Sequence, residues 1–302
     1  MENAPILLFT YKRVESLKQT VKALQQNFLA AESELYIFSD GPKKDIDAEL
    51  VNQVRSFIKD VSGFKNVIIK ESERNKGLAN SIIDGVTEVI KKGGKVIVLE
   101  DDLATTPNFL SFMNQSLSTY SQQENVFSIS GYSFDLGKDN TDGYDAYFLN
   151  RGWSWGWATW ADRWDKVDWQ VSDYESFKLD KQKRKEFAKG GTDLNIMLKR
   201  QMNGLLDSWA IRWFYHQYKI KGLTLYPVYS KVNNNGFDEF ATHTTGNSDR
   251  FKPDLDTEYS DHFSFPGSIV PHPYYQMRFQ KKMGIIARAK YKIQTIIKNI
   301  FK

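Results

Sequence analysis

The sequence predicts an α/β protein in which a mostly parallel sheet is flanked by helices. Short apolar runs and helical patterns alternate four times within the first hundred residues, which is typical of parallel strands joined by crossover helices. The apolar runs are those expected of strands buried on both faces. With 302 residues, 41% hydrophobic and 14% aromatic, the chain is long enough for one large folded domain or two small ones.

The expected elements follow in chain order. Branched and aromatic residues cluster in the expected strands, at residues 5–10, 34–39, 66–70 and 95–99, and later at 127–132 and 223–228. Apolar residues recur at helical spacing in the expected helices, at residues 14–28, 46–60 and 77–90. Residues 173–203 are expected to form charged helices and their connections.

Polar residues follow the four early strands where each one ends, at Thr10-Tyr11, Asp40-Gly41, Arg74-Asn75 and Glu100–Asp102. Parallel sheets bind ligands outside the carboxyl ends of their strands. The pattern therefore predicts one binding site at this edge of the sheet. No glycine-rich phosphate loop follows the first strand and no Walker or dinucleotide motif occurs, which argues against pyrophosphorylases, kinases and dehydrogenases.

Three consecutive acids, Glu100, Asp101 and Asp102, end the apolar run that begins at Lys95. Alternation along a strand points Glu100 and Asp102 to the same side. Carboxylates at the end of a buried strand repel each other and are costly to desolvate, so a positive partner is expected. Oxygen ligands of this kind suit Mg²⁺ or Mn²⁺. The alternative is a solvated acidic turn without function.

The run Val98-Leu99-Glu100-Asp101-Asp102-Leu103, followed by Pro107-Asn108-Phe109-Leu110, resembles the metal-binding motif of GT-A glycosyltransferases. It is similar to bacterial family 2 transferases and closest to the N-acetylglucosaminyltransferase I type, in which Glu-Asp-Asp replaces Asp-X-Asp. The resemblance is specific over residues 4–112 and thinner as far as about residue 245. It implies a Rossmann-like GT-A fold and a nucleotide-sugar donor whose diphosphate binds Mn²⁺ or Mg²⁺.

The resemblance also implies roles for single residues. Asp102 would bind the metal, with Glu100 and Asp101 nearer the nucleoside. The other donor-binding candidates are Thr10, Tyr11, Arg13, Asp40 and Arg74. Asp40 would accept a hydrogen bond from a uracil or a ribose, or simply begin a turn before Gly41. Arg74, in an Arg-Asn-X-Gly-Leu segment, would pair with the diphosphate or with the acidic triplet, unless it is an ordinary surface residue.

Six of the eight tryptophans lie between residues 153 and 169, interleaved with glycine and serine. Tryptophan offers a flat apolar face with a polar edge, which suits a sugar ring. The family has a Gly-Trp loop on the acceptor side, so Trp153 and Trp155 are the candidates for acceptor binding. The alternative is that these rings fill the core.

Asp207 stands between apolar and aromatic neighbours, which predicts partial desolvation and a raised pKa suited to a general base. In the family, an acid before a tryptophan acts as catalytic base. The alternative is a helix N-cap, in which case Asp135, Asp238 or Glu239 would be the base. His243 is a candidate for contact with the metal or the diphosphate, although a lone histidine is as readily an ordinary surface or core residue.

Residues 1–275 are expected to form a single GT-A domain, with a nucleotide-sugar-binding half at 1–125 and an acceptor and catalytic half at 126–275. A basic amphipathic helix is expected at 276–302, because residues 278–302 contain eight Lys or Arg, no acid, and isoleucines at helical spacing. This helix would lie on an anionic membrane or pack on the domain. The absence of cysteine and of a signal sequence favours the cytoplasm, including the inner face of the plasma membrane. A net charge of only +4 argues against a nucleic-acid partner.

The predicted activity is metal-dependent, inverting transfer of a sugar from a UDP-sugar, such as UDP-GlcNAc, to a hydroxyl of a saccharide or lipid-linked saccharide during polysaccharide or glycan synthesis. Two alternatives stay open: a retaining transferase of the same fold, and a non-catalytic carbohydrate-binding module at a membrane.

Overall fold

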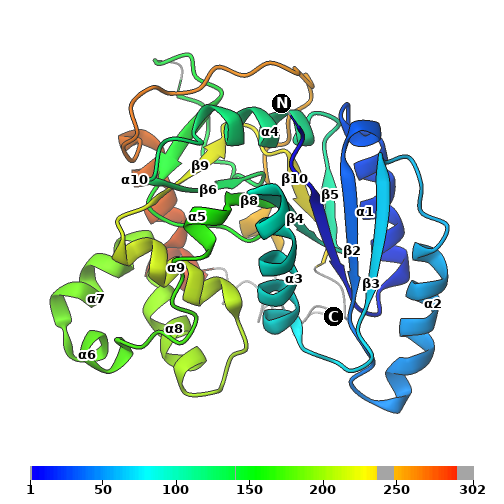
Figure 1. Cartoon of the computed structure of the whole chain (residues 1–302). Coiled ribbons are helices and arrows are strands. Elements are labelled where there is room, and N and C mark those ends of the chain that lie inside the picture. The colour runs from blue at the N-terminus through cyan, green and yellow to red at the C-terminus, as the bar shows by residue number, and fades with distance from the viewer. Residues whose placement is uncertain (1, 140, 237–247, 291–302) are drawn as a thin grey trace.

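The computed structural model describes residues 2–139, 141–236 and 248–290. An eight-stranded sheet runs through the molecule in the order β3-β2-β1-β4-β8-β6-β9-β7, with helices on both faces (Figure 1). Strands β3, β2, β1 and β4 are mutually parallel, whereas β8 is antiparallel to both of its neighbours and β7 is antiparallel to β9. The predicted α/β fold with a mostly parallel sheet is confirmed.

The strands of this sheet are β1 (Ile6–Thr10), β2 (Glu34–Ser39), β3 (Asn66–Glu71), β4 (Lys95–Glu100), β6 (Val126–Ser130), β7 (Ala146–Leu149), β8 (Trp157–Trp160) and β9 (Leu223–Pro227). Every residue of β1, β6, β7, β8 and β9 is buried. A second sheet pairs β5 (Leu103–Thr105) with β10 (Val232–Asn234) in antiparallel fashion. Because β5 follows the acidic triplet directly, this small sheet holds β10 against the end of β4.

The helices are α1 (Val14–Gln25), α2 (Ala48–Ile58), α3 (Leu78–Gly93), α4 (Phe109–Thr119), α5 (Ala161–Trp164), α6 (Tyr174–Leu179), α7 (Lys181–Phe187), α8 (Leu194–Met202), α9 (Trp209–Lys219) and α10 (Pro273–Met283). Helices α1, α2, α4 and α10 share one buried core with one face of the sheet. Helices α3 and α5 to α9 share a second core with the other face. The strands therefore need apolar residues on both sides, as their sequences have.

The tryptophan-rich segment contains a strand that the sequence pattern did not indicate. Strand β8 lies between β4 and β6, and its four residues are buried. The rings of Trp157 and Trp213 have centroids 4.4 Å apart, and Trp164 packs beside them. Much of the tryptophan cluster is therefore core.

The expected C-terminal helix begins earlier than residue 276. Helix α10 runs from Pro273 to Met283, and Tyr275, Phe279 and Met283 bury one of its faces in the core. This part of the basic region packs on the domain. Residues 285–290 are again helical, and residues 291–302 lie outside the described residues. Among the described helices, none is both long and apolar enough to cross a membrane.

Candidate active site

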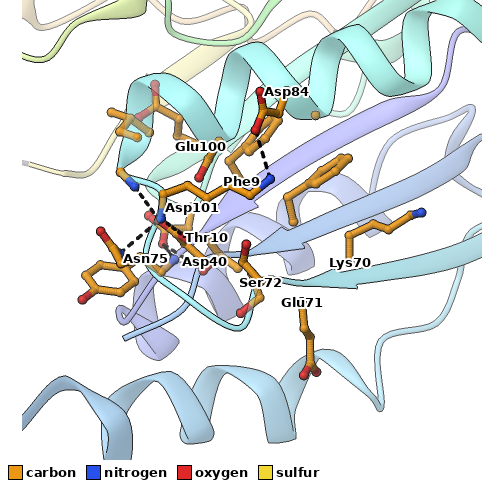
Figure 2. A pocket seen from close by; sticks show the side chains of 18 of the residues that line it. Phe9, Thr10, Asp40, Lys70, Glu71, Ser72, Asn75, Asp84, Glu100 and Asp101 are labelled. Atoms are coloured by element: carbon orange, nitrogen blue, oxygen red, sulfur yellow. Dashed lines mark hydrogen bonds and ion pairs between the residues drawn. The ribbon is translucent and has the colours of Figure 1, made fainter. Parts of the chain in front are cut away.

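A cavity of about 800 Å³ opens at the carboxyl ends of β1 to β4, between these strands and α3 (Figure 2). Its lining brings together residues that are far apart in the sequence. Predicted site residues in this lining are Thr10, Tyr11, Arg13, Asp40, Glu100, Asp101 and Asp207. The convergence expected from the four strand ends is therefore present in the structure, but Asp102 is not among the lining residues.

The carboxylate of Asp40 joins the end of β2 to the segment before α3. Its Oδ1 accepts hydrogen bonds from the backbone N–H groups of Gly41 and Lys76, both at 2.9 Å. Its Oδ2 accepts from the Asn75 side chain at 3.0 Å and from the Gly77 backbone at 3.1 Å. Four donors therefore bond to the two oxygens of Asp40. These bonds support the structural role in the turn before Gly41, which was one of the two alternatives from the sequence. Contact with a nucleoside stays a prediction.

Arg74 does not line the cavity, and its side chain is exposed. Its backbone instead packs against Gly41, where a Cβ would come within 2.6 Å of the carbonyl carbon of Arg74. In the described parts of the chain Arg74 forms no ion pair, so its expected pairing with the acidic triplet is wrong. The neighbouring Asn75, Lys76 and Gly77 line the cavity in its place.

The positive partner of the acidic triplet is Arg13, from the turn between β1 and α1. Its Nη2 donates to Oδ1 of Asp101, and to Oδ2 of Asp102 at 2.9 Å. Asp101 also accepts from the Thr10 hydroxyl at 2.9 Å and from the Tyr11 backbone at 3.3 Å. Both carboxylate oxygens of Asp101 therefore accept hydrogen bonds.

Glu100 lines the cavity, with no hydrogen bond to its carboxyl group from the described residues. Burial, together with the negative charges of Asp102 and Asp101, raises the pKa of Glu100 to about 8. Burial also raises the pKa of Asp101, although Arg13 opposes that shift. Within the triplet, Asp101 and Asp102 therefore pair with the Arg13 guanidinium, whereas the carboxyl group of Glu100 has no hydrogen bond from it.

The donor chemistry at Asp102 fits Mn²⁺ or Mg²⁺. Its side chain is 14% exposed. Among the residues described, no group of three or more histidine and acidic side chains forms a ready-made metal cage. Such a cage is not required, because these ions are commonly held by one or two carboxylates together with substrate phosphates. His243, the other predicted metal contact, lies outside the described residues.

Asp207 lies at the rim of the cavity, just before α9. Its Oδ2 is 3.2 Å from the position that a Cβ on Gly77 would occupy, at the start of α3. The expected desolvation of Asp207 is wrong, because its side chain is exposed. The N-cap of α9 is Ser208, whose side chain accepts from the Ile211 backbone at 3.4 Å. Asp207 is therefore an exposed carboxylate at the cavity, and its negative charge also acts on the guanidinium of Arg212.

Trp153 and Trp155 do not line the cavity. Trp153 is 7% exposed and stacks on Tyr132 with ring centroids 5.6 Å apart. Trp155 is only partly buried and meets Tyr132 edge-on at 4.7 Å. The following Gly156 packs against Val232 of β10, which places this loop on the Asp102 side of the sheet. Acceptor binding by the two tryptophans stays a prediction.

The sequence reasoning missed the apolar floor of the cavity. Phe9 and Phe38 are register partners on β1 and β2, and their rings stack with centroids 4.9 Å apart. Gly85 of α3 lies over them, because a Cβ there would come within 2.8 Å of Phe9 and 3.0 Å of Phe38. A phenylalanine near the end of each of the first two strands was the available signal.

Comparison with known proteins agrees with this geometry. The sequence pattern of glycosyl transferase family 2 matches residues 6–166, more than half of the chain, and the protein belongs to this family. No curated protein matches the chain. The family 2 resemblance is confirmed. The closer likeness to the N-acetylglucosaminyltransferase I type is not confirmed.

Three solved structures of distant similarity illustrate the comparison. TarS of S. aureus is 12% identical, with a TM-score of 0.31, over 47% of this chain and 24% of TarS. The mannosyltransferase PcManGT of Pyrobaculum calidifontis, solved with GDP-Man and Mn²⁺, is 10% identical, with a TM-score of 0.39, over 55% of this chain and 46% of PcManGT. A protein from Desulfovibrio desulfuricans G20 named as a putative nucleotide-diphospho-sugar transferase is 13% identical, with a TM-score of 0.34, over 59% of this chain and 77% of the other. The chain spans less than half the length of the first two.

Proposed function

We propose that this protein is a metal-dependent, inverting glycosyltransferase that moves a sugar from a UDP-sugar to a hydroxyl of a saccharide or lipid-linked saccharide. UDP-GlcNAc is the first donor to test. The observation that carries the proposal is the meeting of Asp207 with Glu100 and Asp101 in one cavity at the carboxyl ends of parallel strands. A cavity of about 800 Å³ is within the range of small-molecule sites.

In this proposal Asp102 holds Mn²⁺ or Mg²⁺, which when bound neutralises charge on the leaving diphosphate. Thr10, Tyr11, Asp40 and the Asn75–Gly77 segment surround the nucleoside. Asp207 accepts the proton of the acceptor hydroxyl while that oxygen attacks the anomeric carbon. The new bond forms on the face opposite the diphosphate, and the bond from the anomeric carbon to the diphosphate oxygen breaks. The exposure of Asp207 supports this role, because an acceptor can reach it.

Donor turnover separates this proposal from a non-catalytic carbohydrate-binding module. Purified protein is incubated with a panel of UDP-sugars with and without Mn²⁺, and released UDP is measured. We expect UDP release from one donor, stimulated by acceptor and abolished by chelation. No release from any donor would favour the binding module. The anomeric configuration of the product by NMR distinguishes inversion from retention.

The metal role of Asp102 is tested by Asp102→Asn. Because an amide is a neutral and weaker ligand, we expect loss of turnover and loss of the thermal stabilisation by UDP with Mn²⁺, while the fold survives. Calorimetry checks the binding. Unchanged Mn²⁺-dependent UDP binding in this variant would remove Asp102 from the metal site.

The C-terminal region supports a second part of the proposal, attachment to an anionic membrane at the cytoplasmic inner face. Ile285 and Ile286 are 70% and 87% exposed beside Lys281 and Lys290, and the basic, acid-free sequence continues to Lys302. We expect sedimentation with phosphatidylglycerol vesicles but not with phosphatidylcholine vesicles. The double substitution Ile285→Ser and Ile286→Ser weakens the binding if these side chains enter the interface.

A further inference from the structure

Arg13 occupies the place where the acidic triplet would receive a metal ion. Its guanidinium bridges Asp101 and Asp102, and its side chain is only 17% exposed. Both contacts come from the same nitrogen, Nη2. Arg13 also lines the cavity and stands immediately before α1. The side chain is therefore close enough to serve either the triplet or a ligand in the cavity.

The second side of Asp102 is closed. A Cβ on Gly236 would lie 2.0 Å from Oδ2 of Asp102, so the backbone of Gly236 covers this oxygen. The Asn235 backbone N–H also donates to the carbonyl oxygen of Asp102 at 2.8 Å. Because Gly236 lies against Oδ2 and Arg13 donates to the same oxygen, a cation bound at Oδ2 would come close to the Arg13 guanidinium.

Two cations cannot share this position. A divalent ion bound at about 2.0–2.2 Å from a carboxylate oxygen would stand a few ångströms from a guanidinium bonded to the same oxygen. At such distances in a partly buried site, the two positive charges repel each other strongly. Arg13 cannot lose its own charge, because arginine stays protonated in proteins. The guanidinium must therefore move when the ion arrives.

We propose that Arg13 is a tethered counter-ion that holds Asp101 and Asp102 in the donor-free protein and leaves Asp102 when a divalent cation binds there, turning to the donor diphosphate. The inference rests on the metal site of the proposed function. Arginine suits both positions, since its fork of N–H donors matches a carboxylate and a phosphate equally well. The exchange couples metal binding to donor binding: an ion arriving alone must displace Arg13, whereas an ion arriving with the diphosphate gives Arg13 a new partner.

The test is Mn²⁺ binding without nucleotide, measured by electron paramagnetic resonance on the full chain. The variants are Arg13→Gln and, as matched control, Lys12→Gln. Lys12 is the adjacent cation, but it pairs with Asp47 at 2.7 Å and does not contact the triplet. Because Arg13→Gln removes the competing charge, we expect it to bind Mn²⁺ about tenfold tighter or more than the wild type. Lys12→Gln should match the wild type. Equal or weaker Mn²⁺ binding by Arg13→Gln overturns the inference.

A second variant covers the case in which Arg13→Gln does not fold. Arg13→Lys keeps the charge but cannot bridge two carboxylates with a planar fork. We expect its Mn²⁺ affinity to lie between those of the wild type and Arg13→Gln, and Mn²⁺ alone to raise its melting temperature more than that of the wild type. A melting temperature that responds to Mn²⁺ as the wild type does contradicts the exchange.

A nucleotide arm separates the inference from the proposed function. With saturating Mn²⁺, Arg13→Gln should bind UDP about tenfold more weakly, because a charge-assisted contact to the diphosphate is lost. Unchanged UDP affinity would show that Arg13 does not bind the donor diphosphate. If the wild type binds no Mn²⁺ even with UDP, the metal-dependent function fails, and tighter Mn²⁺ binding by Arg13→Gln still supports displacement. If the wild type binds Mn²⁺ with UDP and Arg13→Gln gains nothing without it, the inference fails alone.

Discussion

Asp207 lines the cavity with an exposed side chain, close to Gly77 at the start of α3. Asp207→Asn keeps the shape of the side chain but cannot accept a proton. We expect kcat to fall by about 10²–10⁴, the usual contribution of a general base. Calorimetric UDP binding with Mn²⁺ should stay near the wild-type value, because the base acts on the acceptor.

Ser208→Ala is the matched control for Asp207→Asn. It removes the N-cap of α9 one residue away and is expected to cost about 1 kcal/mol of stability while leaving kcat within a few-fold of wild type. Turnover of Asp207→Asn close to wild type would mean that Asp207 is no base. Asp135 would then be a candidate, although it is exposed outside the cavity lining. Asp238 and Glu239 lie outside the described residues.

Positions of single site residues were predictable from the sequence, but their partners were not. The strand ends placed Asp40 and the acidic triplet at one edge of the sheet. Three of the four donors to Asp40 come from Asn75 to Gly77, and the cation on Asp101 comes from Arg13, 88 residues away. Local patterns report burial and periodicity, whereas the choice between Arg13 and Arg74 depends on how the turns pack together. That choice is made by tertiary structure.

Helix α3 packs closely on Phe9 and Phe38, the floor of the cavity, because residue 85 is a glycine. Gly85→Ala would push a methyl group into the rings of Phe9 and Phe38, which cannot move freely because they stack on each other. We expect the free energy of unfolding to fall by about 1–3 kcal/mol, as in other overpacked cores. Urea denaturation measures it.

Gly93→Ala is the control within the same helix. A Cβ there meets only Pro5, at an ordinary distance of 3.5 Å. Alanine is the better helix former by about 1 kcal/mol, so this variant should be neutral or more stable. Equal losses in the two variants would show that glycine in α3 matters for a reason other than contact with the phenylalanines.

A buried ion pair between Lys231 and Asp256 fastens the segment around Asp256 to the rest of the domain. Lys231 donates to Asp256, with side chains 5% and 8% exposed, and Asn108 donates to the same oxygen of Asp256 at 2.8 Å. Burial alone would raise the pKa of Asp256, but the bonds from Asn108 and Lys231 hold it below its ordinary value of 3.8. Its contribution to stability is therefore present above pH 3.8 and is lost as the pH falls further.

Asp256→Asn should lower the free energy of unfolding at pH 7 by about 3–5 kcal/mol, because Lys231 stays buried without its counter-charge. Melting temperatures between pH 2.5 and 7 should show a steeper loss below pH 3.8 in the wild type than in the variant. The double variant Asp256→Asn with Lys231→Met should recover part of the loss. A double variant as unstable as the sum of the single variants would mean that the two side chains act independently.

The architecture of the first hundred residues followed from the alternation of strands and helices. In the second half, the sequence predicted strands β6 and β9 but not the antiparallel strands. Strand β8 was missed because its role is defined by β4 and β6, which lie far from it in the sequence. Strands β5, β7 and β10 are three or four residues long, too short for a clear periodic pattern. Long, repetitive elements were visible in the sequence, and short inserted antiparallel strands were not.

The two halves predicted at 1–125 and 126–275 share one sheet and one core, since β8 pairs with β4 and the Trp157 cluster packs in the same core as α3. We therefore propose that they unfold as one cooperative unit. All eight tryptophans lie between residues 153 and 213, so tryptophan fluorescence reports only the second half. Far-ultraviolet circular dichroism reports the helices of both halves. In urea the two signals should give the same midpoint, as two-state unfolding requires.

A chain cut after residue 166, where the family match ends, should fail to fold, because β6 loses β9 and Trp157 loses Trp209 and Trp213. Separate midpoints, or a folded fragment, would show that the halves are independent domains.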